Sequence, residues 1–223
     1  MVIIFDVVGT LFSLEPLKLE LQRQGLPDHV LRQWFARLLM TAMAATLAGR
    51  YIPFQEAAEA SLRQLAVADE FAQEAVEPVL AALHRLEPWP EAGTTLTSLR
   101  EQGHRLLGLT NSSAEAAADL IVQAEMEHFF DQVLSADEAK ACKPHPAPYR
   151  LALERAGVGP QEAWMIAAHG WDIVGAAAVG LQTVWISRLE KRWPFPDQPP
   201  GAEAADLAGV PAAVAAQKEP IPS

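Results

Sequence analysis

The chain has 223 residues, of which half are hydrophobic and 20% are charged, as in folded globular proteins rather than disordered ones. The net charge of −11 argues against non-specific binding to nucleic acid or to an anionic membrane, because both favour clustered lysine and arginine. An anionic small substrate is compatible with this charge. The single cysteine, Cys142, excludes an intramolecular disulfide.

Targeting signals are missing from the sequence: it has neither a signal-peptide pattern nor an apolar run of membrane-spanning length. We therefore expect a cytoplasmic protein without a membrane partner.

The first predicted element is a short, fully apolar strand at residues 2–5, typical of a parallel sheet covered on both faces. Residues 14–86 show no strand pattern. Apolar side chains recur there at helical spacing, further helical segments follow Pro53 and span 70–86, and prolines separate the segments. This predicts a helical bundle inserted after the first strand. The first long segment is defined by Leu31, Trp34, Phe35, Leu38, Leu39 and Ala42.

From residue 90 onward strands and helices alternate, which predicts a parallel sheet wrapped by helices on both faces. The predicted helices cover residues 91–102, 114–123, 146–156 and 171–179, and the strands cover 105–109, 132–134, 163–167 and 183–186. The expected fold class is therefore α/β. Residues 1–13 and 88–200 would form a Rossmann-like core and 14–87 a helical unit. Residues 201–223 would form a surface tail with one short helix near 210–217.

Ligands of such sheets bind at the carboxyl ends of the strands. Asp6 directly follows the first strand, and Gly9 permits a sharp turn behind it. A carboxylate at this position can act as a nucleophile that forms an ester, with the Thr10 hydroxyl orienting it. A structural aspartate that stabilises a turn or caps a helix is an equally good interpretation of Asp6 alone.

Three further strand or loop ends carry polar residues. Thr110 and Asn111 precede a helix N-terminus, which can bind an anion or can simply be capped by a serine. Lys143 can hold an anionic substrate or keep Asp6 ionised, although a solvent-exposed loop lysine is commoner. Asp172 can position a water, and Trp171 beside it is either a pocket wall or a core residue.

Together these segments resemble the haloacid dehalogenase (HAD) superfamily, up to about Arg188. FDVVGTLF resembles its first motif, LTNSS the second, KPHPAPY the third and AAHGWDIVGAAAVGL the fourth. The inserted helices resemble the superfamily's helical cap. The spacing from Lys143 to Tyr149 and the Trp171–Asp172 pair are similar to type II L-2-haloacid dehalogenases.

The resemblance implies a role for each of these residues. Asp6 would be the nucleophile, Lys143 would balance its charge, and Asp172 would help to activate water. Thr10 would orient the nucleophile, and the pocket would be formed by Thr110, Asn111, Tyr149 and Trp171.

Two missing carboxylates distinguish this chain from the superfamily's phosphatases. Those enzymes carry a second aspartate, which protonates a leaving alcohol, where this chain has Val8. A halide is a weak base and needs no such acid. They carry a magnesium-binding aspartate where this chain has Ala168, and a hard cation needs several oxygen ligands. The resemblance therefore implies displacement at carbon with no cofactor.

The chain also departs from the dehalogenases. Their tyrosine is Val8 here, and their cap arginine is Phe35, with Arg37 two residues on and on another helix face. The serine and asparagine before the Trp-Asp pair are Ala167 and His169. His169 either positions water in place of the asparagine or is a satisfied loop histidine.

Three hypotheses follow. The first is a metal-free hydrolase that removes halide from a small 2-haloalkanoic acid. The second is a phosphatase of a small phosphorylated metabolite, which alone would require magnesium. The third is a weakly active or inactive member that binds a small anion or a protein. Related proteins often dimerise, so a homodimer is left open.

Overall fold

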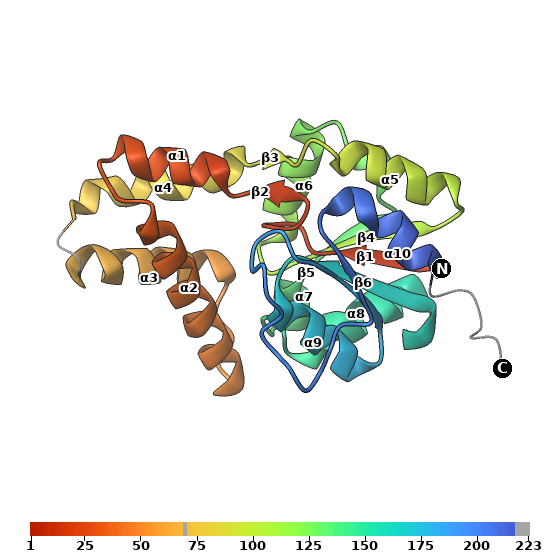
Figure 1. Ribbon diagram of the computed structural model, residues 1–223. Coiled ribbons are helices and arrows are strands. Elements are labelled where there is room, and N and C mark those ends of the chain that lie inside the picture. Colours follow the sequence, from red (N-terminus) through yellow and green to blue (C-terminus); the bar gives the residue numbers. More distant parts are fainter. Residues whose placement is uncertain (69–70, 217–223) are drawn as a thin grey trace.

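A six-stranded, fully parallel sheet forms the centre of the protein, as seen in a computed structural model that describes residues 1–68 and 71–216 (Figure 1). The strand order is β5-β4-β1-β6-β7-β8. The strands are β1 (Val2–Phe5), β4 (Arg105–Thr110), β5 (Gln132–Ser135), β6 (Ala163–Ala167), β7 (Gln182–Ile186) and β8 (Ala202–Ala204). Because β1 lies between β4 and β6, Asp6 emerges near the middle of the sheet edge.

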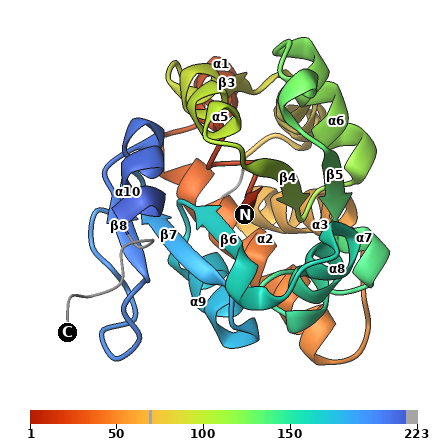
Figure 2. The ribbon, with the colours of Figure 1, turned by 90° about the vertical axis from the view of Figure 1, so that its right-hand side faces the viewer.

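Helices cover both faces of this sheet (Figure 2). The alternating side chains of β1 belong to two separate hydrophobic clusters: Ile3 and Phe5 lie in one, and Val2 and Ile4 in the other. The first cluster packs against α5 (Ala92–Glu101), α6 (Ala114–Gln123) and α10 (Val210–Ala216). The second packs against α8 (Pro146–Ala156) and α9 (Gly170–Val179). The predicted doubly covered parallel sheet is confirmed.

The helical cap, meaning α1 to α4, lies beside the sheet rather than on either face (Figure 1). It consists of α1 (Glu15–Arg23), α2 (His29–Leu47), α3 (Phe54–Ala68) and α4 (Val76–Ala82). The indole N–H of Trp34 on α2 donates to the Ala58 carbonyl of α3 at 3.0 Å, which ties the two longest helices together. None of the helices in the described residues is long and apolar enough to cross a membrane.

The sequence did not predict several short elements. The two connections between cap and core pair as an antiparallel ladder of β2 (Phe12–Ser13) and β3 (Glu87–Pro88). The helix predicted over residues 70–86 is broken into two single turns flanking α4, and residue 70 lies outside the described residues. These turns and the other short segments are η1 (Gln73–Ala75), η2 (Leu83–Arg85), η3 (Glu127–Phe129), α7 (Ala136–Ala139), η4 (Pro160–Glu162) and η5 (Leu207–Gly209).

The expectation of a surface tail after residue 200 is wrong for the residues described. Strand β8 pairs in parallel with β7, so the core sheet extends beyond residue 200. Leu207, Val210 and Val214 are completely buried against the first hydrophobic cluster. The predicted short helix is present as α10, and residue 217, the end expected for it, lies outside the described residues.

Candidate active site

A tight turn after β1 brings Thr10 back onto Asp6. Gly9 has a φ of +89°, a value that favours glycine, and the Val7 carbonyl accepts hydrogen bonds from the N–H groups of Leu11 and Phe12. The Thr10 hydroxyl donates to Asp6 Oδ2 at 2.6 Å and accepts from the backbone N–H of Ala168 at 2.9 Å. The Asp6 carboxylate is therefore fixed in orientation.

Lys143 is completely buried and lies between two carboxylates. Its Nζ donates to Asp6 Oδ1 at 2.9 Å, to Asp172 Oδ2 at 2.7 Å and to the Leu109 carbonyl at 2.9 Å. An ammonium has three donors, so all of them are used. The sequence predicted this cation, whereas the carbonyl at the end of β4 was missed, because backbone acceptors carry no sequence signal.

The charges of this cluster set its protonation. Burial acts to lower the pKa of Lys143, but the charges of Asp172 and Asp6 outweigh burial and raise the pKa, so the ammonium stays charged. Burial raises the pKa of Asp172 to about 6, against the opposing attraction of Lys143. Asp172 therefore changes charge close to physiological pH.

Tyr149 holds the second carboxylate from behind. Its hydroxyl donates to Asp172 Oδ1 at 2.6 Å and lies 3.1 Å from the Asp172 carbonyl oxygen. This approach depends on Gly175 of α9, since a Cβ there would lie 2.6 Å from the tyrosine oxygen and 2.6 Å from Pro144 Cβ. Tyr149 positions Asp172 and is absent from the cavity wall beside Asp6.

Asn111 and Thr110 follow β4, as predicted. Asn111 Oδ1 accepts from the backbone N–H of Lys143 at 2.8 Å, so its amide nitrogen points elsewhere and has no hydrogen-bond partner among the described residues. The Thr110 hydroxyl accepts from the Ser112 N–H at 3.1 Å and stabilises the turn into α6. Ser113 caps that helix by accepting from the Ala116 N–H at 3.1 Å. Asn111 is thus the better placed donor for a ligand.

Three aromatic rings form a wall of the site, with His169 lying between Phe35 and Trp171. The His169 ring centroid lies 5.5 Å from that of Phe35 and 5.4 Å from that of Trp171, with which it is stacked. His169 Nε2 lies over Gly9, where a Cβ would be only 2.7 Å away, and has no hydrogen-bond partner in the part of the chain described. Burial lowers the pKa of His169, so its ring is neutral at pH 7.

Glu190 is a residue that the sequence did not indicate. Its carboxylate accepts from the Gly170 N–H at 3.0 Å and lies 4.0 Å from His169 Nδ1. It therefore stabilises the start of α9 and faces the far side of the histidine ring. Glu190 comes from the loop after β7, far from any recognisable motif.

A cavity of about 20 Å³ adjoins Asp6, large enough for about one group of water size. Its wall is formed by Asp6, Val8, Phe35, Leu39, Phe54, Thr110, Asn111, Ser112 and Trp171. Arg37 is absent from this wall, so it does not replace the arginine expected in the cap. The cavity is thus bounded by both the core and the helical cap.

The carboxylates do not fit a magnesium site. Each of the four oxygens of Asp6 and Asp172 already accepts a hydrogen bond, from Thr10, Lys143 or Tyr149. Ala168 supplies no further oxygen ligand, and a hard cation needs several. Among the described residues, no group of three or more His, Cys, Asp or Glu side chains is placed to hold a metal ion.

Comparison with known proteins places the chain in a family. The model of the haloacid dehalogenase-like hydrolases matches residues 1–180. The chain belongs to this family of hydrolases. It is 33% identical over 194 residues to haloacetate dehalogenase H-2 of Moraxella sp. (strain B), covering 83% of this chain and 85% of that protein. It is 30% identical to (S)-2-haloacid dehalogenase 2 of Pseudomonas sp. (strain CBS-3), covering 83% of each.

A solved structure agrees closely with the whole fold. The L-2-haloacid dehalogenase RSc1362 superposes with a TM-score of 0.91 and 27% identity, covering 96% of this chain and 98% of that one. The predicted HAD fold, a parallel core with an inserted helical cap, is confirmed.

Proposed function

We propose that the chain hydrolyses a small 2-haloalkanoic acid, releasing halide with Asp6 as nucleophile and without a metal ion. The observation that carries this proposal is the Asp6 carboxylate, held by Thr10 at 2.6 Å and Lys143 at 2.9 Å beside a largely apolar cavity. The similarity to proteins named haloacetate and 2-haloacid dehalogenases supports the substrate class.

The first step is a displacement at the halogen-bearing carbon. An Asp6 oxygen forms a bond to that carbon, and the carbon–halogen bond breaks with its electron pair leaving on the halide. The product is an ester between Asp6 and the substrate. Val8, in place of a second carboxylate, donates no proton to the leaving group, and a halide requires none.

In the second step water attacks the carbonyl carbon of the Asp6 ester. His169 accepts the proton of this water at Nε2, which is unpaired among the described residues and sits on a neutral ring. Asp172 keeps Lys143 in place at 2.7 Å. As the ester C–O bond breaks, the departing alkoxide takes the proton held on His169 and leaves as a 2-hydroxy acid, and the other proton of the water is released to solvent, which restores the Asp6 carboxylate.

Substrate binding is assigned to the remaining predicted residues. The free amide of Asn111 and the turn at Thr110 bind the substrate carboxylate, and Phe35 and Trp171 provide an apolar wall around the reacting carbon. Closure of the cap, which we place at residues 14–87, would exclude bulk water. The predictions of a homodimer, a cytoplasmic location and no nucleic-acid partner are untested.

The test is halide release from bromoacetate and racemic 2-chloropropionate, each with and without EDTA. We expect release that is unchanged by EDTA and abolished in Asp6→Asn. The matched control is Asp119→Asn on the exposed side of α6, which should keep full activity. Magnesium-dependent release of phosphate from phosphate esters would instead favour the phosphatase, and binding of haloacid without turnover would favour the inactive member.

A further inference from the structure

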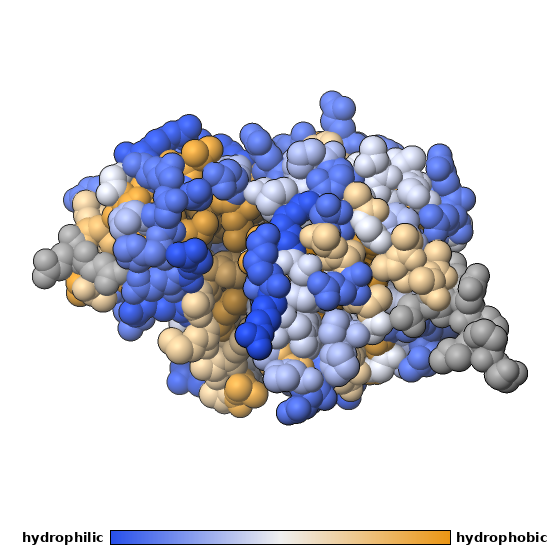
Figure 3. All heavy atoms as spheres, viewed as in Figure 1, coloured by the Kyte–Doolittle hydropathy of each residue, from blue (hydrophilic) through white to orange (hydrophobic). Residues whose placement is uncertain are grey.

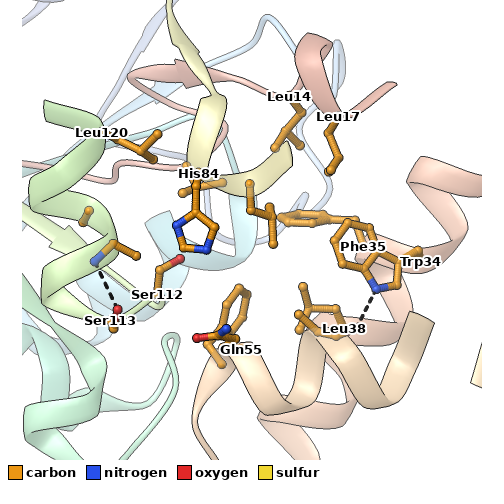
Figure 4. Close-up of a pocket in the computed structure, with 16 residues that line it drawn as sticks. Leu14, Leu17, Trp34, Phe35, Leu38, Gln55, His84, Ser112, Ser113 and Leu120 are labelled. Carbon is orange, nitrogen blue, oxygen red and sulfur yellow. Dashed lines mark hydrogen bonds between the residues drawn. The ribbon is translucent and has the colours of Figure 1, made fainter. Parts of the chain in front are cut away.

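A second cavity lies between the helical cap and α6, next to the one at Asp6 (Figure 4). This side chamber has a volume of about 60 Å³. A group of water size needs about 10–15 Å³ of such space, so the side chamber accommodates a chain of about four carbons. Its walls are mainly apolar and include Leu14, Leu17, Trp34, Leu38 and Leu120.

The side chamber adjoins the cavity at the nucleophile. Val8, Phe35, Phe54 and Ser112 line both spaces. Val8 stands two residues after Asp6, so a group attached to the reacting carbon passes this side chain on leaving the first cavity. The first cavity is smaller than the side chamber, so an alkyl substituent on the reacting carbon finds room in the side chamber.

One side of the side chamber is polar. Figure 4 shows His84 and Ser112 on the side away from Trp34 and Leu38, with Gln55 below them. His84 and Gln55 are exposed and come from η2 and α3. The other walls are apolar, and the residues that line the space include no Asp, Glu, Lys or Arg, which suits an alkyl chain of limited length better than a charged group.

We propose that the side chamber binds the alkyl substituent on C2 of the substrate, so that the preferred substrates are 2-haloalkanoates with straight chains of up to about four carbons beyond C2. This rests on the proposed function. Burial contributes about 0.8 kcal/mol per methylene, which raises kcat/KM about fourfold for each added carbon. Carbons beyond those that the chamber's volume of about 60 Å³ accommodates gain nothing more.

The experiment compares kcat/KM for bromoacetate, 2-bromopropionate, 2-bromobutyrate, 2-bromohexanoate and 2-bromooctanoate. We expect a rise to a maximum near 2-bromohexanoate. A flat or falling series with active bromoacetate would overturn the side chamber proposal and leave the proposed function standing. No halide release from any member would overturn both.

A variant on α6 tests the location. Ala116 lines the side chamber, and Ala116→Leu should remove most of the gain from bromoacetate to 2-bromohexanoate. Ala118 lies on the other side of α6, in a shallow surface groove, so Ala118→Leu is the matched control and should keep the wild-type ratio. An unchanged ratio in Ala116→Leu would refute the assignment.

A measurement on the wild-type chain needs no variant. Acetate, butyrate and hexanoate lack the halogen and should inhibit competitively, with Ki falling about fourfold per methylene up to hexanoate. Equal Ki values for the three acids would contradict the proposal.

Discussion

Replacing Lys143 with methionine is expected to destabilise the fold strongly. The substitution keeps most of the side-chain volume and removes the ammonium that bonds to Asp6 at 2.9 Å and to Asp172 at 2.7 Å. Removing one partner of a buried ion pair costs about 3–5 kcal/mol, because the remaining charge is left without compensation. A change of 1 kcal/mol in the free energy of unfolding shifts the melting temperature of a chain of this size by about 2–4 °C. We therefore expect the melting temperature to fall by about 6–20 °C.

This loss should depend on pH. Without the cation, the buried carboxylates of Asp6 and Asp172 have no counter-charge between them. Burial and the charge of Asp6 then raise the pKa of Asp172 in the folded variant above the unfolded value near 3.9. The folded variant therefore binds a proton more readily than the unfolded chain does. Proton binding stabilises the folded variant fully at a pH below the unfolded pKa. This stabilisation is lost as the pH rises through the pKa of the folded variant. The deficit relative to wild type should thus be largest at pH 8 and smaller at pH 6.

Urea unfolding of the wild type and Lys143→Met at pH 8 and pH 6 measures both effects. Lys140→Met, at an exposed lysine three residues away, is the control and should unfold close to wild type. A deficit below about 1 kcal/mol at pH 8, or one that does not change with pH, would refute the view of Lys143 as an obligatory counter-charge.

Three further predictions concern the turn, the acid and the tail. The pKa of Asp172 is raised to about 6, so kcat/KM should rise with pH through about 6 as the carboxylate ionises, and Asp172→Asn should lose this dependence together with most activity. Gly9→Ala should lower both turnover and the melting temperature, since φ is +89° and the new Cβ would lie 2.7 Å from His169 Nε2; normal halide release would contradict this. Leu207→Ala should cost about 2–5 kcal/mol in urea unfolding because Leu207 is fully buried, whereas a loose tail would show no loss.

The sequence predicted the regular core well because its boundaries carry strong local signals. The helix at residues 146–156 begins at a proline and ends at Gly157, whose φ of +68° makes it a helix terminator. By contrast, β8 has the sequence Ala-Glu-Ala, which has no β-branched residue, and it forms only because β7 offers an unpaired edge. The two-residue strands β2 and β3 likewise form only because the two connections between cap and core meet in space.

The site was predictable where a residue stands at the end of a strand, and not where it depends on packing. The sequence predicts that Asp6, Lys143 and Asp172 lie together, and in the structure the Lys143 ammonium forms an ion pair with each of the two carboxylates. The role of Gly175 in admitting Tyr149 requires knowing how closely α8 and α9 approach. Glu190 follows Gly170 by 20 residues and meets it only because the loop after β7 folds back.

The cap and Lys143 are positioned by shared contacts, which links the position of α2 to the charge cluster. Near the end of α2, the Thr46 hydroxyl accepts from the backbone N–H of Cys142 at 3.0 Å, and the Tyr51 hydroxyl donates to Asp137 of α7. The next backbone N–H, that of Lys143, donates to Asn111. A movement of α2 away from the core therefore has to break a hydrogen bond to the residue adjoining Lys143. Because α2 also carries Phe35, whose ring lies beside that of His169, the helix that lines the cavity and the loop that supplies its cation are connected by the same set of hydrogen bonds.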